Sequence, residues 1–173
     1  MGSKAGRGGS LLRRLNKVVL VSVVFVGLLS GCGLLHQGPS AEEQNEIVRS
    51  ALIATVPSAI DAFVDVYYQG PKQGYAVTVY VSEVADEDLA QIVDRSLEAT
   101  WAAASFSPNE VGLVIVEGAR QPELSPAATD GVDLGPVIDE LNLVGVRDPF
   151  DVLFVQESLL ESRYGEWTES TDD

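Results

Sequence analysis

Helical spacing of apolar residues marks the start of the folded part of the chain. Ser40 and Glu43 form a capping box, in which Ser40 is the N-cap residue and Glu43 lies at N3. Apolar residues then recur at helical intervals: Ile47, Val48, Ala51 and Leu52. Pro57 stops this pattern. The sequence therefore predicts a helix over residues 41–54.

Two alternating segments follow and predict a β-hairpin. Residues 59–68 and 75–81 each alternate between two faces, which is the period of a half-buried strand. Because the apolar sets of both strands must share one face, the numbers of paired residues must sum to an odd number. A loop over residues 69–74 that pairs Tyr68 with Tyr75 meets this condition.

The outer face of the predicted hairpin carries aromatic side chains. The register sets Phe63 opposite Tyr80, with Tyr67 opposite Ala76. Aromatic rings with acidic residues around them suit a basic or sugar-bearing ligand, so Phe63, Tyr67 and Tyr80 form a candidate partner surface. The alternative, which we take as the expected arrangement, is that a C-terminal helix beginning at Asp148 covers this face.

The next helix is opened by the acidic run at residues 86–88, where the helix dipole favours negative charge. Its apolar stripe consists of Leu89, Ile92, Val93, Leu97, Trp101 and Ala104. Residues 111–116 are apolar at odd and even positions alike, which indicates a strand covered on both faces. Residues 118–132 are rich in proline and glycine and predict a loop.

Two further helices are predicted near the C-terminus. One covers residues 136–141. The other begins at Asp148 with Pro149 at N1 and ends at Gly165. Its stripe consists of Phe150, Leu153, Phe154, Leu160 and Tyr164. Residues 166–173 are acidic and predict a frayed tail.

Together these elements predict one α+β domain over residues 40–165. The order helix–strand–strand–helix–strand gives a small sheet of about three strands, with additional C-terminal helices. This order resembles that of the BON domain, which occurs in periplasmic and envelope-associated proteins. The resemblance covers the order of elements alone, and a shared fold carries little information about function.

The first 31 residues differ in kind from the rest of the chain. They contain five basic residues and no acidic residue, followed by an apolar run from Val18 to Leu29. As a helix, this run would span roughly 18 Å, which is short of the ~30 Å hydrocarbon core of a bilayer. A basic segment, a short apolar segment and small residues predict a signal peptide over residues 1–31.

The tetrapeptide Leu29, Ser30, Gly31 and Cys32 closes this apolar run. It resembles the lipobox of bacterial lipoproteins, in which an aliphatic residue, a small residue and Gly or Ala precede an invariant cysteine. The resemblance implies transfer of diacylglycerol to the Cys32 thiol and recognition of Leu29, Ser30 and Gly31 by the lipoprotein signal peptidase. Cys32 would then be the lipid-bearing mature N-terminus, so residues 32–39 would form the lipidated end and a short tether, with the tether itself over residues 33–39.

This resemblance implies a protein held on the extracytoplasmic face of the cell membrane. Arg13 and Arg14 leave a twin-arginine export route open, although Leu12, Asn16 and Lys17 around the pair favour the general secretion route. The body has one lysine and five arginines and is rich in alanine, valine, glycine and acids. This composition favours a Gram-positive host with a high-GC genome.

Charge and residue types exclude several classes of function. The chain from Cys32 onward has six basic and 26 acidic residues, a net charge of −20, which argues against binding of nucleic acid. Cys32 is the only cysteine and His36 the only histidine, so we expect neither an intrachain disulfide nor a Cys/His zinc site. The spacing of Glu123, Asp130 and Asp133 does not match a calcium loop. We therefore expect no metal and no cofactor.

Three functional hypotheses remain from the sequence. The favoured one is a non-catalytic envelope lipoprotein that binds an envelope protein or glycan. The second is a carboxylate-dependent enzyme, although Glu110 and Glu117 lie about 23 Å apart on one strand, and glycosidase carboxylates need roughly 5–10 Å. The third is a small-molecule carrier, which would require an apolar cavity of ~300 Å³ or more.

Overall fold

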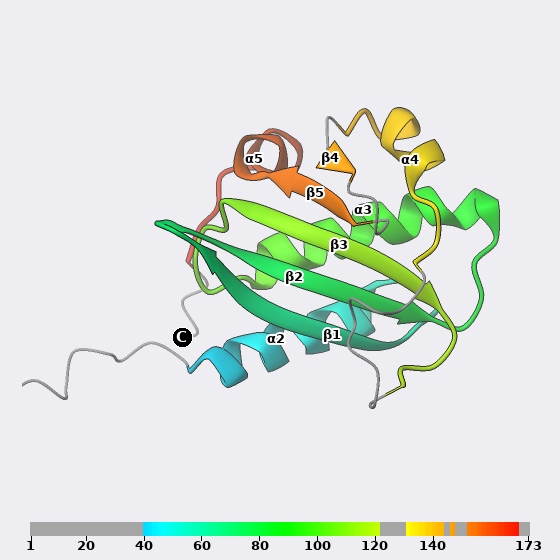
Figure 1. The fold of residues 1–173 in the computed structure, drawn as a ribbon, viewed down its shortest axis with the longest axis horizontal. Coiled ribbons are helices and arrows are strands. Elements are labelled where there is room, and N and C mark those ends of the chain that lie inside the picture. Colours follow the sequence, from blue (N-terminus) through cyan, green and yellow to red (C-terminus); the bar gives the residue numbers. More distant parts are fainter. Residues whose placement is uncertain (1–39, 122–130, 144–145, 148–151, 170–173) are drawn as a thin grey trace, which may run out of the picture. The chain divides into compact units, whose positions relative to one another are not determined.

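The computed structural model describes residues 40–121, 131–143, 146–147 and 152–169 (Figure 1). These residues form a mixed α+β fold, as predicted. The elements, labelled as in Figure 1, are α2 (Ala41–Thr55), β1 (Ala59–Gln69), β2 (Lys72–Val81), α3 (Asp86–Ala103), β3 (Glu110–Glu117), α4 (Gly135–Glu140), β4 (Val146–Arg147), β5 (Leu153–Gln156) and α5 (Glu157–Tyr164).

The sheet has the strand order β1-β2-β3-β5-β4 in the described residues. β1 and β2 are antiparallel, β2 and β3 are parallel, and β5 is antiparallel to both β3 and β4. The parallel pair requires a crossover, which α3 supplies between β2 and β3. The predicted order helix–strand–strand–helix–strand is therefore confirmed, but the sheet is wider than the expected three strands.

The hydrophobic core lies between α2 and α3 and one face of the sheet. A row of paired residues crosses four strands on this inner face, Val64–Val77–Leu113–Leu153, and each is buried. The predicted stripe of α3 also faces this core, and Trp101 is 4% exposed. At the start of α2, the Glu43 N–H donates to Ser40 Oγ at 3.2 Å, as the capping box predicts.

The predicted hairpin register is wrong by two residues. The ladder continues to Gln69 and Lys72, which leaves only Gly70 and Pro71 in the turn. Gly70 has φ 64°, as expected at the first central position of a type II′ turn, and this tight turn extends both strands into the expected loop. Because the shift is even, each side chain keeps its predicted face.

The corrected register changes the partners on the outer face. Phe63 lies opposite Thr78, while Tyr80 lies opposite Asp61. The expected pair of Phe63 and Tyr80 is therefore absent from the ladder.

The predicted helix from Asp148 to Gly165 is wrong in its first half. Residues 153–156 form β5, and the helix begins only at Glu157, while Asp148 itself lies outside the described residues. Leu153 and Val155 are buried, with Phe154 between them on the other face. A strand satisfies the second edge of β3 through backbone hydrogen bonds, which a helix at this place could not do. The predicted end of the helix at Gly165 is confirmed.

The C-terminal helix does not cover the outer face of the hairpin, contrary to expectation. Its contacts run to α3, where Tyr164 Oη donates to Asp94 Oδ1 at 2.8 Å and Arg163 Nε pairs with the same oxygen at 2.6 Å. Trp101 Nε1 donates to the Gly165 carbonyl at 3.1 Å. Beyond the helix, Trp167 Nε1 donates to the Ala104 carbonyl, so the packed chain extends into the expected tail.

Candidate functional site

The outer face of the sheet is built from rows of paired residues. Two rows cross β1, β2, β3 and β5 in that order: Tyr67–Gly74–Glu110–Gln156 and Asp65–Ala76–Gly112–Phe154. Three of the four residues on the middle strands, Gly74, Ala76 and Gly112, are small, while larger side chains stand on β1 and β5. In the part of the chain that the structure describes, α2 and α3 pack on the opposite face (Figure 1). The outer face is therefore hollow along its centre.

This hollow is a groove of about 820 Å³, which we call the outer-face groove. Its large apolar and aromatic side chains are Phe63, Tyr67, Tyr68, Val114, Val152 and Phe154. Two carboxylates, Asp65 and Glu110, also line it. Tyr68, near the end of β1, also borders the groove and is 72% exposed. The groove thus combines apolar surface with negative charge.

Two glycines set the depth of the groove. A Cβ at Gly112 would lie 3.0 Å from Cε1 of Phe154, because that ring rests on the glycine. A Cβ at Gly74 would contact the Glu110 carbonyl oxygen and would lie 2.9 Å from the Tyr67 hydroxyl. Both rings therefore lie close to the backbone of a glycine, where a side chain would not fit at this separation.

A hydrogen bond between strands fixes one end of the groove. Tyr67 Oη donates to Glu110 Oε1 at 2.7 Å. Burial raises the pKa of the Tyr67 hydroxyl well above its usual range, and the hydrogen bond to the Glu110 carboxylate raises it further. The phenol therefore stays protonated at neutral pH and acts as a donor.

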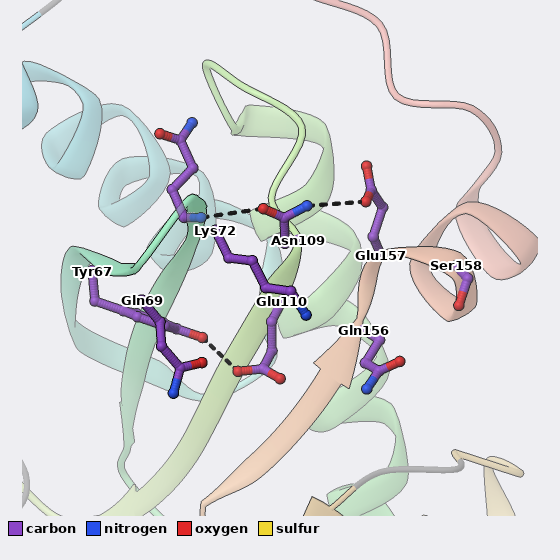
Figure 2. Close-up of a pocket in the computed structure, with 9 residues that line it drawn as sticks. Tyr67, Gln69, Lys72, Asn109, Glu110, Gln156, Glu157 and Ser158 are labelled. Carbon is purple, nitrogen blue, oxygen red and sulfur yellow. Dashed lines mark hydrogen bonds between the residues drawn. The ribbon is translucent and has the colours of Figure 1, made fainter.

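A smaller polar pocket of about 340 Å³ adjoins this end (Figure 2). Asn109 organises it: the Gln73 N–H donates to Asn109 Oδ1 at 3.2 Å, and Asn109 Nδ2 donates to Glu157 Oε2 at 3.3 Å. Ser107 Oγ donates to the other carboxylate oxygen of Glu157 at 2.7 Å. Lys72 extends over this pocket toward Glu110 (Figure 2). These bonds tie β2 and the start of β3 to α5.

The structure brings together two of the three aromatic residues that the sequence singled out. Phe63 and Tyr67 line the groove, and the Arg120 guanidinium lies 5.0 Å from the centroid of the Phe63 ring. Tyr80 is 2% exposed and does not line it.

Sequence reasoning missed Phe154, because its segment was expected to be helical. It considered Glu110 only as a catalytic carboxylate and did not assign Glu110 or Tyr68 to this face, because the neighbours of both residues depend on how the strands pair. The lipobox residues and His36 lie outside the described residues.

The two acidic residues considered for catalysis, Glu110 and Glu117, remain apart. Glu110 and Glu117 stand at the two ends of β3. Asp61 pairs with Arg49, whose Nη2 lies 2.7 Å from Asp61 Oδ1. Within the described ranges, no group of three or more His, Cys, Asp or Glu residues could hold a metal ion. None of the helices that the structure describes is long and apolar enough to span a membrane.

Comparison with known proteins gives no relative from which to transfer a function. No protein-family model, curated protein or solved structure matches the chain.

Proposed function

We propose that the protein is a non-catalytic lipoprotein of the cell envelope that binds another envelope component in the outer-face groove. In this proposal, residues 1–31 direct export, and Cys32 carries the lipid that holds the protein on the extracytoplasmic face of the cell membrane. The tether over residues 33–39 reaches at most roughly 25 Å, so the domain works close to the bilayer.

The observation that carries the binding proposal is the groove of about 820 Å³ on the sheet face opposite α2 and α3. Ligand sites are concave, mostly apolar and furnished with a few polar groups, and this groove has all three features. Its aromatic rings supply contact area, and its exposed carboxylate, Asp65, favours a partner that carries positive charge or hydroxyl groups.

The hydrogen bonds of the acidic residues support binding over carboxylate catalysis. Both oxygens of Glu157 accept hydrogen bonds, from Ser107 and Asn109, and Glu110 accepts one from Tyr67. These carboxylates hold strands and a helix together, which is a structural task.

A small-molecule carrier is the second candidate, and the size of the groove favours it. A volume of about 820 Å³ exceeds the ~300 Å³ at the lower end of ligand pockets. Mass spectrometry of an organic extract of the natively purified lipoprotein tests this alternative. A stoichiometric small molecule that is absent from an Ala76→Leu variant would favour the carrier.

Photo-crosslinking in the native envelope tests the main proposal. A benzoylphenylalanine residue replaces Tyr68 at the rim in the full-length protein, and a control places it at Ala102, an exposed position on α3. We expect a discrete crosslinked product from position 68 only. Ala76→Leu, which fills the floor of the groove, should abolish that product while the protein stays folded. Equal products from both positions, or a product insensitive to Ala76→Leu, would refute binding in the groove.

A further inference from the structure

The long edge of the sheet next to the groove is formed by β1. This strand has 11 residues and pairs with β2 alone in the described residues. Gln69 and Lys72 flank the two-residue turn, so they form a hydrogen-bonded pair. In an antiparallel ladder every second pair is of this kind, and the hydrogen-bonded pairs therefore include those of Tyr67 and Phe63 with β2. The N–H and C=O groups of the even-numbered residues therefore point away from β2, toward the open edge.

One end of this edge is closed by side chains. The outward N–H of Ala62 donates to Asp61 Oδ1 at 2.8 Å, and its outward carbonyl accepts from Arg49 Nε at 3.1 Å. Arg49 also pairs with Asp61 at 2.7 Å and with Glu46 at 3.0 Å. This arrangement satisfies the backbone of Ala62 without a neighbouring strand, which protects the edge at that point.

The remainder of the edge has no such protection. In the described part of the chain, no side chain or backbone group bonds the outward N–H and C=O groups of Val64, Val66 and Tyr68. Asn45 lies one helical turn before Arg49 on the same side of α2, and its buried Oδ1 has no hydrogen-bond partner. Both the strand and its covering helix thus leave polar groups unpaired, and each such group carries a cost when it is not solvated.

We propose that β1 binds an extended segment of a partner polypeptide, which adds a strand along Val64–Tyr68 and whose side chains alternate between basic and apolar. This inference rests on the proposed binding function and names the class of partner. Strand addition uses backbone hydrogen bonds for affinity and side-chain surfaces for specificity. Five residues of β1 offer a pairing length of about 17 Å.

Negative charge on the outer face of the edge favours a basic segment. Asp65 is exposed on the outer face beside Tyr67, whereas Glu46 on the α2 side already pairs with Arg49. Side chains of an added strand point alternately to these two faces, so basic residues at the parity of the outer face meet the Asp65 carboxylate, and apolar residues at the other parity face the side of α2. The net charge of −20 from Cys32 onward adds a long-range attraction for a cationic segment.

The same charges oppose a second copy of this chain as the occupant. An antiparallel pair of two β1 edges would bring the Asp65 carboxylates of both copies close together. Like charges opposite each other destabilise a sheet, and two bodies of −20 repel. A cationic partner meets neither obstacle.

Hydrogen exchange with synthetic peptides tests this inference on the full-length lipoprotein in phosphatidylcholine nanodiscs. The probe is a blocked eight-residue peptide of alternating lysine and valine. One control has N-methyl groups on alternate residues, so it keeps its charge but cannot pair. A second control alternates glutamate and valine. We expect the first peptide to slow amide exchange in residues 64–68, and both controls to bind at least tenfold more weakly.

Two variants at position 68 distinguish the contribution of the backbone N–H to peptide binding from that of the side chain. Tyr68→Pro removes an outward N–H but no bond of the ladder, and edge strands tolerate proline there. Tyr68→Ala removes the ring and keeps the N–H. We expect Tyr68→Pro to weaken peptide binding at least tenfold and Tyr68→Ala less than threefold. Unchanged circular dichroism and urea midpoints show that both variants fold.

The remaining outcomes distinguish strand addition at β1 from binding in the outer-face groove. Equal binding of the N-methylated peptide, or no binding of the lysine–valine peptide at millimolar concentration, would overturn strand addition. Protection of residues 64–68 that rises with protein concentration without peptide would assign the edge to a second copy instead. If these tests fail while the Tyr68 crosslink persists, the binding function stands and only the strand-pairing partner is refuted. If the crosslink is lost while the peptide still pairs, strand addition stands and binding in the groove is refuted.

Discussion

Tyr67 on β1 and Glu110 on β3 are joined by a hydrogen bond of 2.7 Å that passes over Gly74 of the intervening strand. The three residues are paired across the sheet, so a side chain at the middle position would stand between the other two. The absence of a side chain at Gly74 is thus what lets two strands that are not neighbours make a direct contact. This contact closes one end of the outer-face groove.

Gly74→Ala should destabilise the protein by about 1–3 kcal/mol, as overpacking does. The new Cβ would meet both the Tyr67 ring and the Glu110 carbonyl oxygen. Urea denaturation measures the change. Adding Tyr67→Ala should not restore stability, because the backbone oxygen remains in place. Full rescue by Tyr67→Ala would show that the ring alone requires glycine here.

Trp101→Ala should cost about 3–5 kcal/mol of unfolding free energy, because it removes a large side chain that is 4% exposed. It also leaves the Gly165 carbonyl without its donor. Ala102→Ser, at an exposed position on the same helix, should change stability by less than about 0.5 kcal/mol. A Trp101→Ala protein with the parent's urea midpoint would contradict the packing described for α3.

Alanine substitutions along β5 should alternate in their effect. Leu153→Ala removes a fully buried side chain from the inner face and should cost about 2–5 kcal/mol. Phe154→Ala acts on the half-buried groove face and should cost less, although the side chain is larger. A helix would give no such alternation, so equal costs in urea denaturation would count against the strand.

Asp61→Asn should reduce the dependence of stability on acidic pH. Burial alone raises the pKa of Asp61, but hydrogen bonds from Arg49 and the Ala62 N–H, with the Arg49 charge, lower it below its usual value. Stability from this carboxylate is therefore present above the unfolded pKa of about 4 and is lost as pH falls through the lower folded pKa.

Urea midpoints between pH 6 and pH 2 measure this dependence. Below pH 4 the parent should lose more stability than Asp61→Asn does. Asp65→Asn, which removes an exposed carboxylate from the same strand, controls for the change in net charge. Identical acid profiles for the parent and Asp61→Asn would rule out the stabilising role of the ion pair.

Cys32→Ala should abolish lipid attachment and leave an uncleaved or shed precursor. The reason is that only a thiol forms the thioether that the lipobox resemblance implies. The domain should still fold, since Cys32 is the only cysteine and no intrachain disulfide is lost. Mass spectrometry of the mature N-terminus is the measurement. If the mature N-terminal peptide of the unsubstituted protein begins anywhere but at an acylated Cys32, the proposed lipid anchor is refuted.

Local patterns in the sequence were sufficient to predict most of the helices and strands. The capping box at Ser40, the stripe of α3 and the alternation of β1 and β2 each express the geometry of one element, so composition and spacing alone reveal them. The parity of the hairpin also followed from sequence, because an apolar face must meet an apolar face. Phe63 and Tyr67 could be assigned to the outer surface for the same reason.

The tertiary structure alone decided which partner each element has. Residues 153–156 carry apolar residues that suit a helix or a strand, and the unpaired edge of β3 favoured the strand through backbone hydrogen bonds. Parity fixes faces but not register, so only the tight turn at Gly70 set Phe63 opposite Thr78. The groove likewise depends on residues far apart in sequence, because Gly74, Gly112 and Phe154 become neighbours only when the strands pair.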